Sequence, residues 1–178
     1  VEEVSLPELD TLVQLRQRGS LTAVESYAYF REWLDTRPDE FDPIISVRML
    51  AGKDMTAVDF LALQRAFEDL RRRFHRRMAG FDALLTPTTP FTALPVAQAD
   101  TDDYSRINGL CLRNTSAANQ LGLCALSLPC GFDEAALPIG LQLICRPFEE
   151  NTALCLGQAY EDATSWHQRR PALEDFAP

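Results

Sequence analysis

The sequence predicts an α/β fold in which a mixed β-sheet is covered by helices on both of its faces. Two apolar runs of strand length, residues 124–128 and 139–145, are separated by a short linker. Such a short linker predicts neighbouring strands, most simply an antiparallel pair. Leu143, Ile144 and the glycines of this region are typical of strands that helices bury on both faces.

The first part of the chain is expected to be helical. Apolar residues within 9–17 predict a short helix, which Gly19 ends. The Thr-x-x-Glu pattern that begins at Thr22 is a capping box, and it opens a second helix that runs to about Leu34. An Arg-Pro pair then stops this helix, because the residue before a proline avoids helical backbone. The polar residues 39–43 are predicted to form a loop.

The longest helix is predicted to begin at the Thr-x-x-Asp pattern of residues 56–59. Apolar residues then recur at every third or fourth position, so the helix has one apolar face. Gly80 suits the left-handed position just beyond its end. The residues of this face are Phe60, Leu63, Phe67, Leu70, Phe74 and Met78.

The second half of the chain alternates strands, loops and helices. Residues 83–86 predict a short buried strand, and residues 86–90 (TPTTP) predict an irregular loop, because two prolines remove donors and fix the backbone. Residues 107–121 predict a helix that Gly122 ends. Two acids precede a final helix over residues 151–164, where they suit the positive end of the helix dipole.

Composition limits the class of protein. A chain of 178 residues without repeats or a linker is expected to form one unit, and its 46% hydrophobic and 24% charged residues are ordinary for a soluble globular protein. No run approaches the roughly 20 apolar residues of a membrane helix, and the N-terminal residues do not form a signal peptide. The net charge of −9 opposes broad binding to nucleic acid or to anionic membranes.

The cysteines and histidines predict a cytoplasmic protein without a cofactor. Five cysteines are an odd number, and their apolar surroundings suggest reduced, buried side chains. The only two histidines are far apart, and the sequence has no C-x-x-C or H-x-x-x-H spacing and no Gly-rich phosphate loop. We therefore expect no metal and no other cofactor. The cysteines are Cys111, Cys124, Cys130, Cys145 and Cys155.

Four short runs in the second half carry a resemblance to a known family. They are the TP-x-x-P run within 82–90, N-x-x-G-L at 119–123, L-S-L-P-x-G-F at 126–132 and L-P-I-G-L-Q-L at 137–143. Together they resemble the C-terminal half of the amidase signature family, whose members hydrolyse or transfer amides. The resemblance implies that family's fold, a large mixed sheet covered by helices.

The resemblance also implies a catalytic half that lies outside this chain. The family uses a serine nucleophile, activated by a second serine that bridges to a neutral lysine, and forms an acyl-enzyme. The Gly/Ser-rich loop that carries those serines does not occur here. The single lysine, Lys53, stands beside Asp54, which is expected to keep it charged. We therefore expect residues 1–178 to be the C-terminal portion of one amidase domain, inactive alone.

Five residues are candidates for binding a small amide substrate. Thr88, Thr89 and Phe91 follow a predicted strand, where ligands commonly bind in layered α/β folds, although a rigid turn explains the same residues. In the resemblance, Leu112 stands where the glutamine-dependent tRNA amidotransferase has, in its A subunit, an acid that holds the substrate's amino group. Asn119 would face the substrate or brace the adjoining loop.

The resemblance therefore implies an amidohydrolase that acts on a small amide other than glutamine. Leu112 is apolar, and Tyr27 and Tyr29 replace smaller residues of the amidotransferase branch. The alternatives are that amidotransferase subunit, or a non-catalytic binding module that kept the fold.

Two expectations concern partners. The arginine-rich run 71–77 suits either an RNA-phosphate contact or a solvated helix face. The net negative charge of the chain favours the solvated face. A missing half would leave a sheet edge and an apolar face uncovered, so the chain alone is expected to self-associate through that face.

Overall fold

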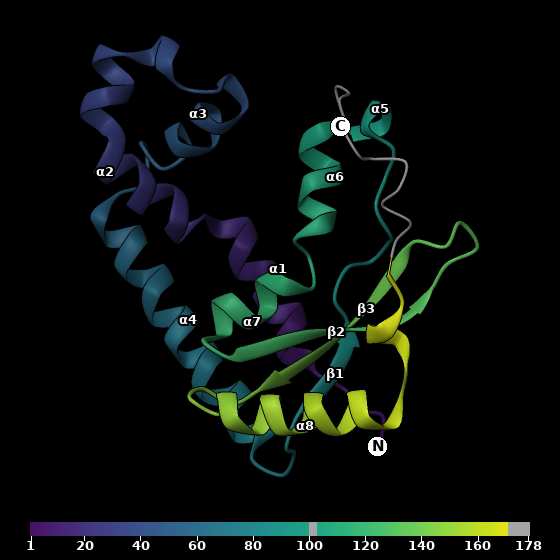
Figure 1. Ribbon diagram of the computed structural model, residues 1–178. Helices are drawn as coiled ribbons and strands as arrows, with labels where there is room; N and C mark the ends of the chain where they lie inside the picture. Colours follow the sequence, from purple (N-terminus) through teal and green to yellow (C-terminus); the bar gives the residue numbers. More distant parts are fainter. Residues whose placement is uncertain (100–102, 171–178) are drawn as a thin grey trace. The chain divides into compact units, whose positions relative to one another are not determined.

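The computed structural model describes residues 1–99 and 103–170, and it confirms the α/β class (Figure 1). The chain divides into two compact units, residues 1–74 and 75–178. The division falls inside a helix, α4 (Ala57–Met78), where no linker exists. A single domain over residues 1–178 stays a prediction.

The first unit is built of helices, and residues 1–74 contain no strand. Helix α1 ends at Gly19, as predicted. Helix α2 begins at Leu21, two residues earlier than a cap at Thr22 predicts. Its cap is Ser20, whose hydroxyl accepts the Ala23 N–H at 3.1 Å, so the assignment of the cap to Thr22 was wrong. The helices are α1 (Pro7–Arg18), α2 (Leu21–Thr36), the 3₁₀ turn η1 (Pro38–Glu40), α3 (Pro43–Leu50) and the first part of α4.

Helix α3 begins at the last residue of the predicted loop 39–43 and continues through residues 44–50, for which the sequence predicted no element. The Asp42 carboxylate accepts the backbone N–H groups of Ile44 and Ile45 at 2.8 and 3.2 Å, and Pro43 takes the first helical position. The Asp-Pro pair therefore starts a helix here and does not extend a loop.

Helix α4 begins where the sequence predicted. The Thr56 hydroxyl accepts the Asp59 N–H at 3.1 Å and donates to the Asp59 carboxylate at 2.6 Å. Its predicted apolar face is confirmed, with Phe60 half-buried and the other five residues buried. Gly80 has no positive φ, so the predicted left-handed cap was wrong; the Phe81 N–H instead bonds the Met78 carbonyl at 3.0 Å.

The second unit contains a three-stranded sheet in the order β1-β3-β2, with both pairs antiparallel. Strand β1 is Leu84–Pro87, β2 is Cys124–Phe132 and β3 is Pro138–Cys145. The predicted antiparallel pairing of β2 with β3 is confirmed. Burial on both faces holds only for the last four residues of β3, since Leu85 in β1 is 42% exposed and β2 is mostly half-buried.

The predicted helix over 107–121 is two helices, α6 (Tyr104–Cys111) and α7 (Thr115–Leu121). The Asn114 side chain, in the break between them, donates to the Pro87 carbonyl at 2.8 Å. This bond to a remote segment competes with a continuous helix, and periodicity alone does not predict it. Gly122 ends α7 with a φ of 67°, as predicted.

Helix α8 (Glu150–Ala163) packs on β2 and β3 (Figure 1). A Cβ at Gly157 would lie 2.5 Å from the Leu126 side chain, so glycine permits this close approach. The remaining elements of this unit are α5 (Val96–Ala99) and the 3₁₀ turn η2 (Trp166–Gln168).

The cysteine side chains are more exposed than the sequence predicted. Of the five cysteines only Cys145 is buried, and Cys155 is exposed, so the expectation that all are buried was wrong.

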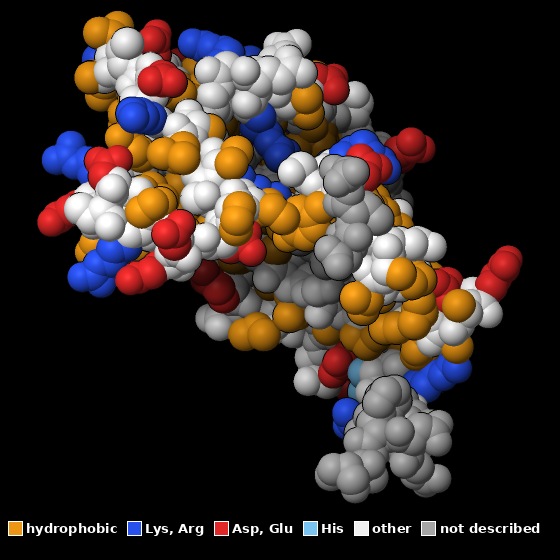
Figure 2. All heavy atoms as spheres, turned by 90° about the horizontal axis from the view of Figure 1, so that it is seen from above, with side chains coloured by type: hydrophobic (Ala, Val, Ile, Leu, Met, Phe, Trp, Pro, Cys, Tyr) orange, Lys and Arg blue, Asp and Glu red, His pale blue; other side chains and the backbone are white. Residues whose placement is uncertain are grey.

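Figure 2 shows apolar side chains between charged ones on one face of the surface. Among residues 1–99 and 103–170, no helix is long and apolar enough to span a membrane. The most exposed large side chains of α2 to α4 are Tyr29, Trp33, Val47 and Val58.

Candidate functional site

The loop that follows β1 is fastened to both other strands of the sheet. The Thr88 N–H donates to the Gly140 carbonyl at 2.9 Å, and the hydroxyls of Thr88 and Ser127 lie 2.6 Å apart. A Cβ at Gly140 would lie 2.7 Å from the Thr88 hydroxyl oxygen and 3.0 Å from that of Ser127. Glycine is therefore what lets β1, β2 and β3 meet at this point. The predicted loop begins later than expected, because β1 includes Thr86 and Pro87.

The outer part of this loop presents a hydroxyl and an aromatic ring. The Thr89 hydroxyl donates to the Phe91 carbonyl at 2.8 Å, which closes a tight local turn. Thr89 is exposed, whereas Thr88 and Phe91 are half-buried. The arrangement is both a rigid turn and a surface with the polar and apolar groups that an amide-binding wall needs.

Asn114 brings a second candidate segment to the same loop. Its amide bonds the Pro87 carbonyl, the residue before Thr88. Leu112 stands two residues before Asn114 and is 48% exposed. The structure thus connects the segments that carry Leu112 and Thr88, although they are far apart in the sequence.

Asn119 is not in the apolar setting that the sequence suggested. It is exposed on α7. Its backbone carbonyl accepts the Gly122 N–H at 3.2 Å, but within the described residues its side chain makes no hydrogen bond to the candidate loop.

Gln142 forms the centre of a polar row across the sheet. It is 4% exposed, and it pairs in register with Thr86 and Ser127. The Thr86 hydroxyl donates to its side-chain carbonyl at 3.2 Å. A buried amide held in this way fixes the register of β1 against β3.

Asp133 fixes the turn between β2 and β3. Its carboxylate accepts the Thr92 hydroxyl at 2.6 Å and the N–H groups of Ala135 and Leu137 at 2.9 Å each. The bond from Thr92, followed by that from Leu137, holds the pKa of Asp133 below its ordinary value. Thr92 directly follows Phe91, so the candidate loop is anchored at both of its ends.

The buried thiol of Cys145 is not activated as a nucleophile. Burial raises the pKa of the Cys145 thiol to about 11, with Cys124 opposite as a smaller cause, so Cys145 is not a thiolate at neutral pH. Lys53 is exposed in the turn after α3. Over residues 1–99 and 103–170, no cluster of His, Cys, Asp and Glu has an arrangement that could hold a metal ion.

Sequence reasoning missed Asn114, Ser127 and Gly140 as partners of the candidate loop. Ser127 lies inside the L-S-L-P run and Gly140 inside the L-P-I-G-L run. The presence of both runs in one chain with TP-x-x-P was the sequence feature that could have indicated these two partners. Nothing in the sequence pattern points to Asn114.

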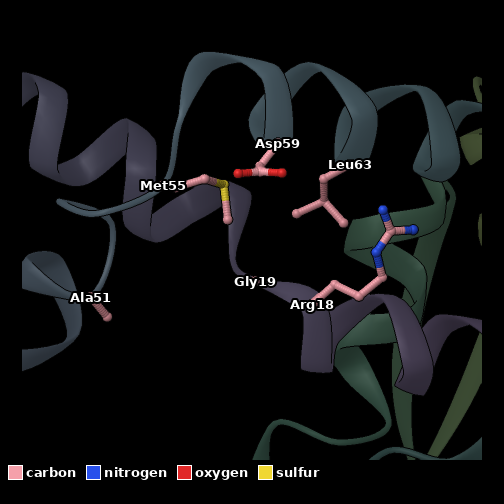
Figure 3. Close-up of a pocket in the computed structure, with 6 residues that line it drawn as sticks. All are labelled: Arg18, Gly19, Ala51, Met55, Asp59 and Leu63. Atoms are coloured by element: carbon pink, nitrogen blue, oxygen red, sulfur yellow. The ribbon is translucent and has the colours of Figure 1, made fainter.

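A separate cavity of about 290 Å³ lies within residues 1–74 (Figure 3). It is formed where the end of α1, the end of α3 and the start of α4 meet. None of the five candidate substrate-binding residues lines it. The lining residues are Arg18, Gly19, Ala51, Met55, Asp59 and Leu63.

Comparison with known proteins identifies relatives over most of the chain. A family model described as Amidase matches residues 1–154. The A subunit of glutamyl-tRNA(Gln) amidotransferase from Synechococcus sp. is 37% identical over 143 residues, and that from Chloroflexus aggregans is 38% identical over 144 residues. Each match covers 78% of this chain and 29% of the relative, so the chain spans less than a third of these curated relatives.

Solved structures agree with the sequence matches. A crystal structure of an amidase is 28% identical with a TM-score of 0.74, over 93% of this chain and 38% of that chain. Allophanate hydrolase of Kluyveromyces lactis is 25% identical with a TM-score of 0.76, over 86% of this chain and 25% of that chain. These similarities extend across both units of the chain.

Proposed function

The chain belongs to the amidase family, and from that membership we propose that it is the C-terminal part of an enzyme that cleaves the C–N bond of a small amide. The main observation that supports this proposal is the match of the family model to residues 1–154. The proposed reaction proceeds through a Ser-Ser-Lys acyl-enzyme, with all three catalytic residues outside residues 1–178. Only water is needed as co-substrate, so the proposal includes no metal and no other cofactor.

In this proposal the chain supplies one wall of the substrate pocket. The Thr88 and Thr89 hydroxyls orient the polar amide, and Phe91 and Leu112 contact the apolar part of the substrate. The anchoring of this loop at Thr88 supports the role, because substrate positioning requires side chains held by the surrounding structure. The exposure of Asn119 and its lack of a bond to the loop favour a substrate-facing role over bracing.

The test is ammonia release from a panel of small amides. It compares the 178-residue chain with a protein extended by the upstream sequence. We expect only the extended protein to be active, since the proposed Ser-Ser-Lys triad lies outside residues 1–178. Turnover by the short chain would overturn the assignment of the triad, and Lys53 would be the first residue to mutate. Ligand binding without release by the extended protein would instead indicate a binding module.

The second candidate is the A subunit of a glutamine-dependent tRNA amidotransferase. The identities of 37–38% to such subunits favour it. The apolar Leu112 favours another substrate, because it offers no charge to a substrate ammonium group. Glutaminase activity of the extended protein with its native Leu112 would support the amidotransferase. If activity with glutamine requires Leu112→Asp, the hydrolase of another amide is favoured.

We also propose a cytoplasmic location, supported by five cysteine thiols of which four are at least partly exposed.

The chain by itself is proposed to self-associate. Trp33 is 51% exposed and Val58 is 76% exposed, and apolar side chains are visible at the surface in Figure 2. Light scattering and a hydrophobic dye test this proposal: a monomer that binds no dye contradicts it.

A further inference from the structure

The cavity in residues 1–74 has a shape that the local sequence produces. A Cβ at Gly19 would lie 2.2 Å from the terminal methyl of Met55 and 3.6 Å from Leu63. Glycine therefore lets the Met55 side chain lie against the link between α1 and α2 (Figure 3). Leu63 is 2% exposed and, with Met55, forms an apolar floor.

Opposite charges flank this floor. Arg18 is the last residue of α1, and within the described residues its guanidinium has no ion pair and no hydrogen bond. Asp59 lies in the first turn of α4, where one carboxylate oxygen accepts the Thr56 hydroxyl at 2.6 Å. Arg18 and Asp59 do not pair with each other, and in Figure 3 the Leu63 side chain lies between their charged groups.

We propose that this cavity binds a small zwitterion with a carboxylate and an ammonium group joined by a short apolar chain. The carboxylate pairs with Arg18, whose planar guanidinium donates two parallel hydrogen bonds. The ammonium group pairs with Asp59, and the chain between them lies along the apolar floor, chiefly against Met55. The volume of about 290 Å³ is at the lower end for small-molecule sites, which suits a ligand of a few carbon atoms.

Each simpler ligand class fits this cavity less well. The Asp59 carboxylate repels a simple anion, and the Arg18 guanidinium repels a simple cation. A neutral molecule supplies no counter-ion to either charge. A purely structural explanation is that Arg18 complements the end of α1 while Asp59 caps α4. That explanation predicts no ligand, so a binding experiment separates the two.

The experiment titrates the 178-residue chain with γ-aminobutyrate at low ionic strength and follows amide chemical shifts by NMR. We expect saturable shifts at residues 18, 19, 55, 59 and 63, with a dissociation constant on the order of 1 mM. Butyrate and butylamine each lack one charged group and should bind about tenfold more weakly. Salt should weaken binding, because the charged groups are open to solvent.

Two pairs of variants test the charges. Arg18→Gln should weaken binding about tenfold. Arg16→Gln is the matched control, since Arg16 is exposed on the same helix and does not line the cavity. Asp59→Asn keeps an oxygen for the Thr56 hydroxyl and should also weaken binding, whereas Asp54→Asn, outside the cavity, should not.

Several outcomes would overturn the proposal. They are the absence of a saturable shift with a folded chain, equal effects of Arg18→Gln and Arg16→Gln, or binding of butylamine as tight as that of γ-aminobutyrate. The readout is binding by the chain alone, so failure here leaves the proposed amide hydrolysis untouched.

Discussion

The two units of the chain are stabilised in different ways. In residues 1–74, side chains such as Ser20, Asp42 and Thr56 cap the helices that they precede. In residues 75–178, side chains join segments that are far apart in the sequence, as when Thr88 bonds Ser127 and Asn114 bonds Pro87. The first unit therefore combines an apolar helix face with local caps, whereas the second adds polar bonds between remote segments to its apolar core.

This difference explains why the recognisable motifs lie in the second unit. TP-x-x-P contributes Thr88, L-S-L-P contributes Ser127, and L-P-I-G-L-Q-L contributes Gly140 and Gln142, all in one bonded network. A network of this kind requires particular residues, whereas an apolar helix face accepts any side chain of suitable size.

The largest effect is expected in the apolar face of α4. Phe67→Ala removes a ring that is 4% exposed and should lower the free energy of unfolding by about 3–5 kcal/mol, since it leaves a cavity. Urea denaturation measures the loss, with the 51% exposed Leu61→Ala as control. Hydrogen exchange should rise most in residues 1–74. An equal rise in β2 and β3 would mean that both units unfold together.

The next effect tests the close approach at Gly140. Gly140→Ala places a methyl group against Thr88 and Ser127 and should cost about 1–3 kcal/mol through overpacking. Gly131→Ala is the matched control, because it lies in β2 with no atom within 4 Å of its Cβ position. Similar losses in both variants, measured by thermal unfolding, would rule out the contact as the cause.

A smaller effect tests the bond from Asn114. Asn114→Ala removes one hydrogen bond and should cost about 1 kcal/mol, with faster hydrogen exchange at Thr88. Asn119→Ala, an asparagine exposed on α7, should change stability by less than about 0.5 kcal/mol. If Asn114→Ala and Asn119→Ala change the free energy of unfolding and the hydrogen exchange at Thr88 equally, the Asn114 bond does not fasten the loop.

The smallest expected effect is on the stability of the chain at low pH. The pKa of Asp133 is below its ordinary value of 3.8, so its contribution to stability is complete above that value and is lost as the pH falls through the lowered pKa. Asp133→Asn should therefore destabilise the chain at neutral pH and flatten its loss of stability below about pH 4. Parallel stability curves for variant and parent between about pH 2 and pH 6 would contradict this.

Local patterns in the sequence predicted local structure well. The spacing from Phe60 to Met78 predicted α4, and the apolar runs predicted the pairing of β2 and β3. Helix α3 was missed because it has only eight residues and begins with an Asp-Pro pair that is also typical of loops. Competing caps two residues apart, Ser20 and Thr22, explain the shifted start of α2.

The candidate site was predictable only in part, for a physical reason. The loop of Thr88, Thr89 and Phe91 follows a strand, which is a local signal. Its partners Asn114, Ser127 and Gly140 are brought to it by the sheet and by the break between α6 and α7, and short-range periodicity does not encode such contacts. The burial of cysteines was overestimated because apolar sequence neighbours do not determine which face of an element is covered.

The strand order β1-β3-β2 has a consequence for how the protein is made. Strand β1 leaves the ribosome first, but its partner in the sheet is β3, and the residues that pair are 54 to 60 positions apart, from Pro87 with Leu141 to Leu84 with Ile144. At roughly 5–20 residues per second, β1 waits several seconds while its partner is synthesised. Because only five residues separate β2 from β3, we expect this hairpin to close first and β1, which leads into the candidate loop, to join the sheet last.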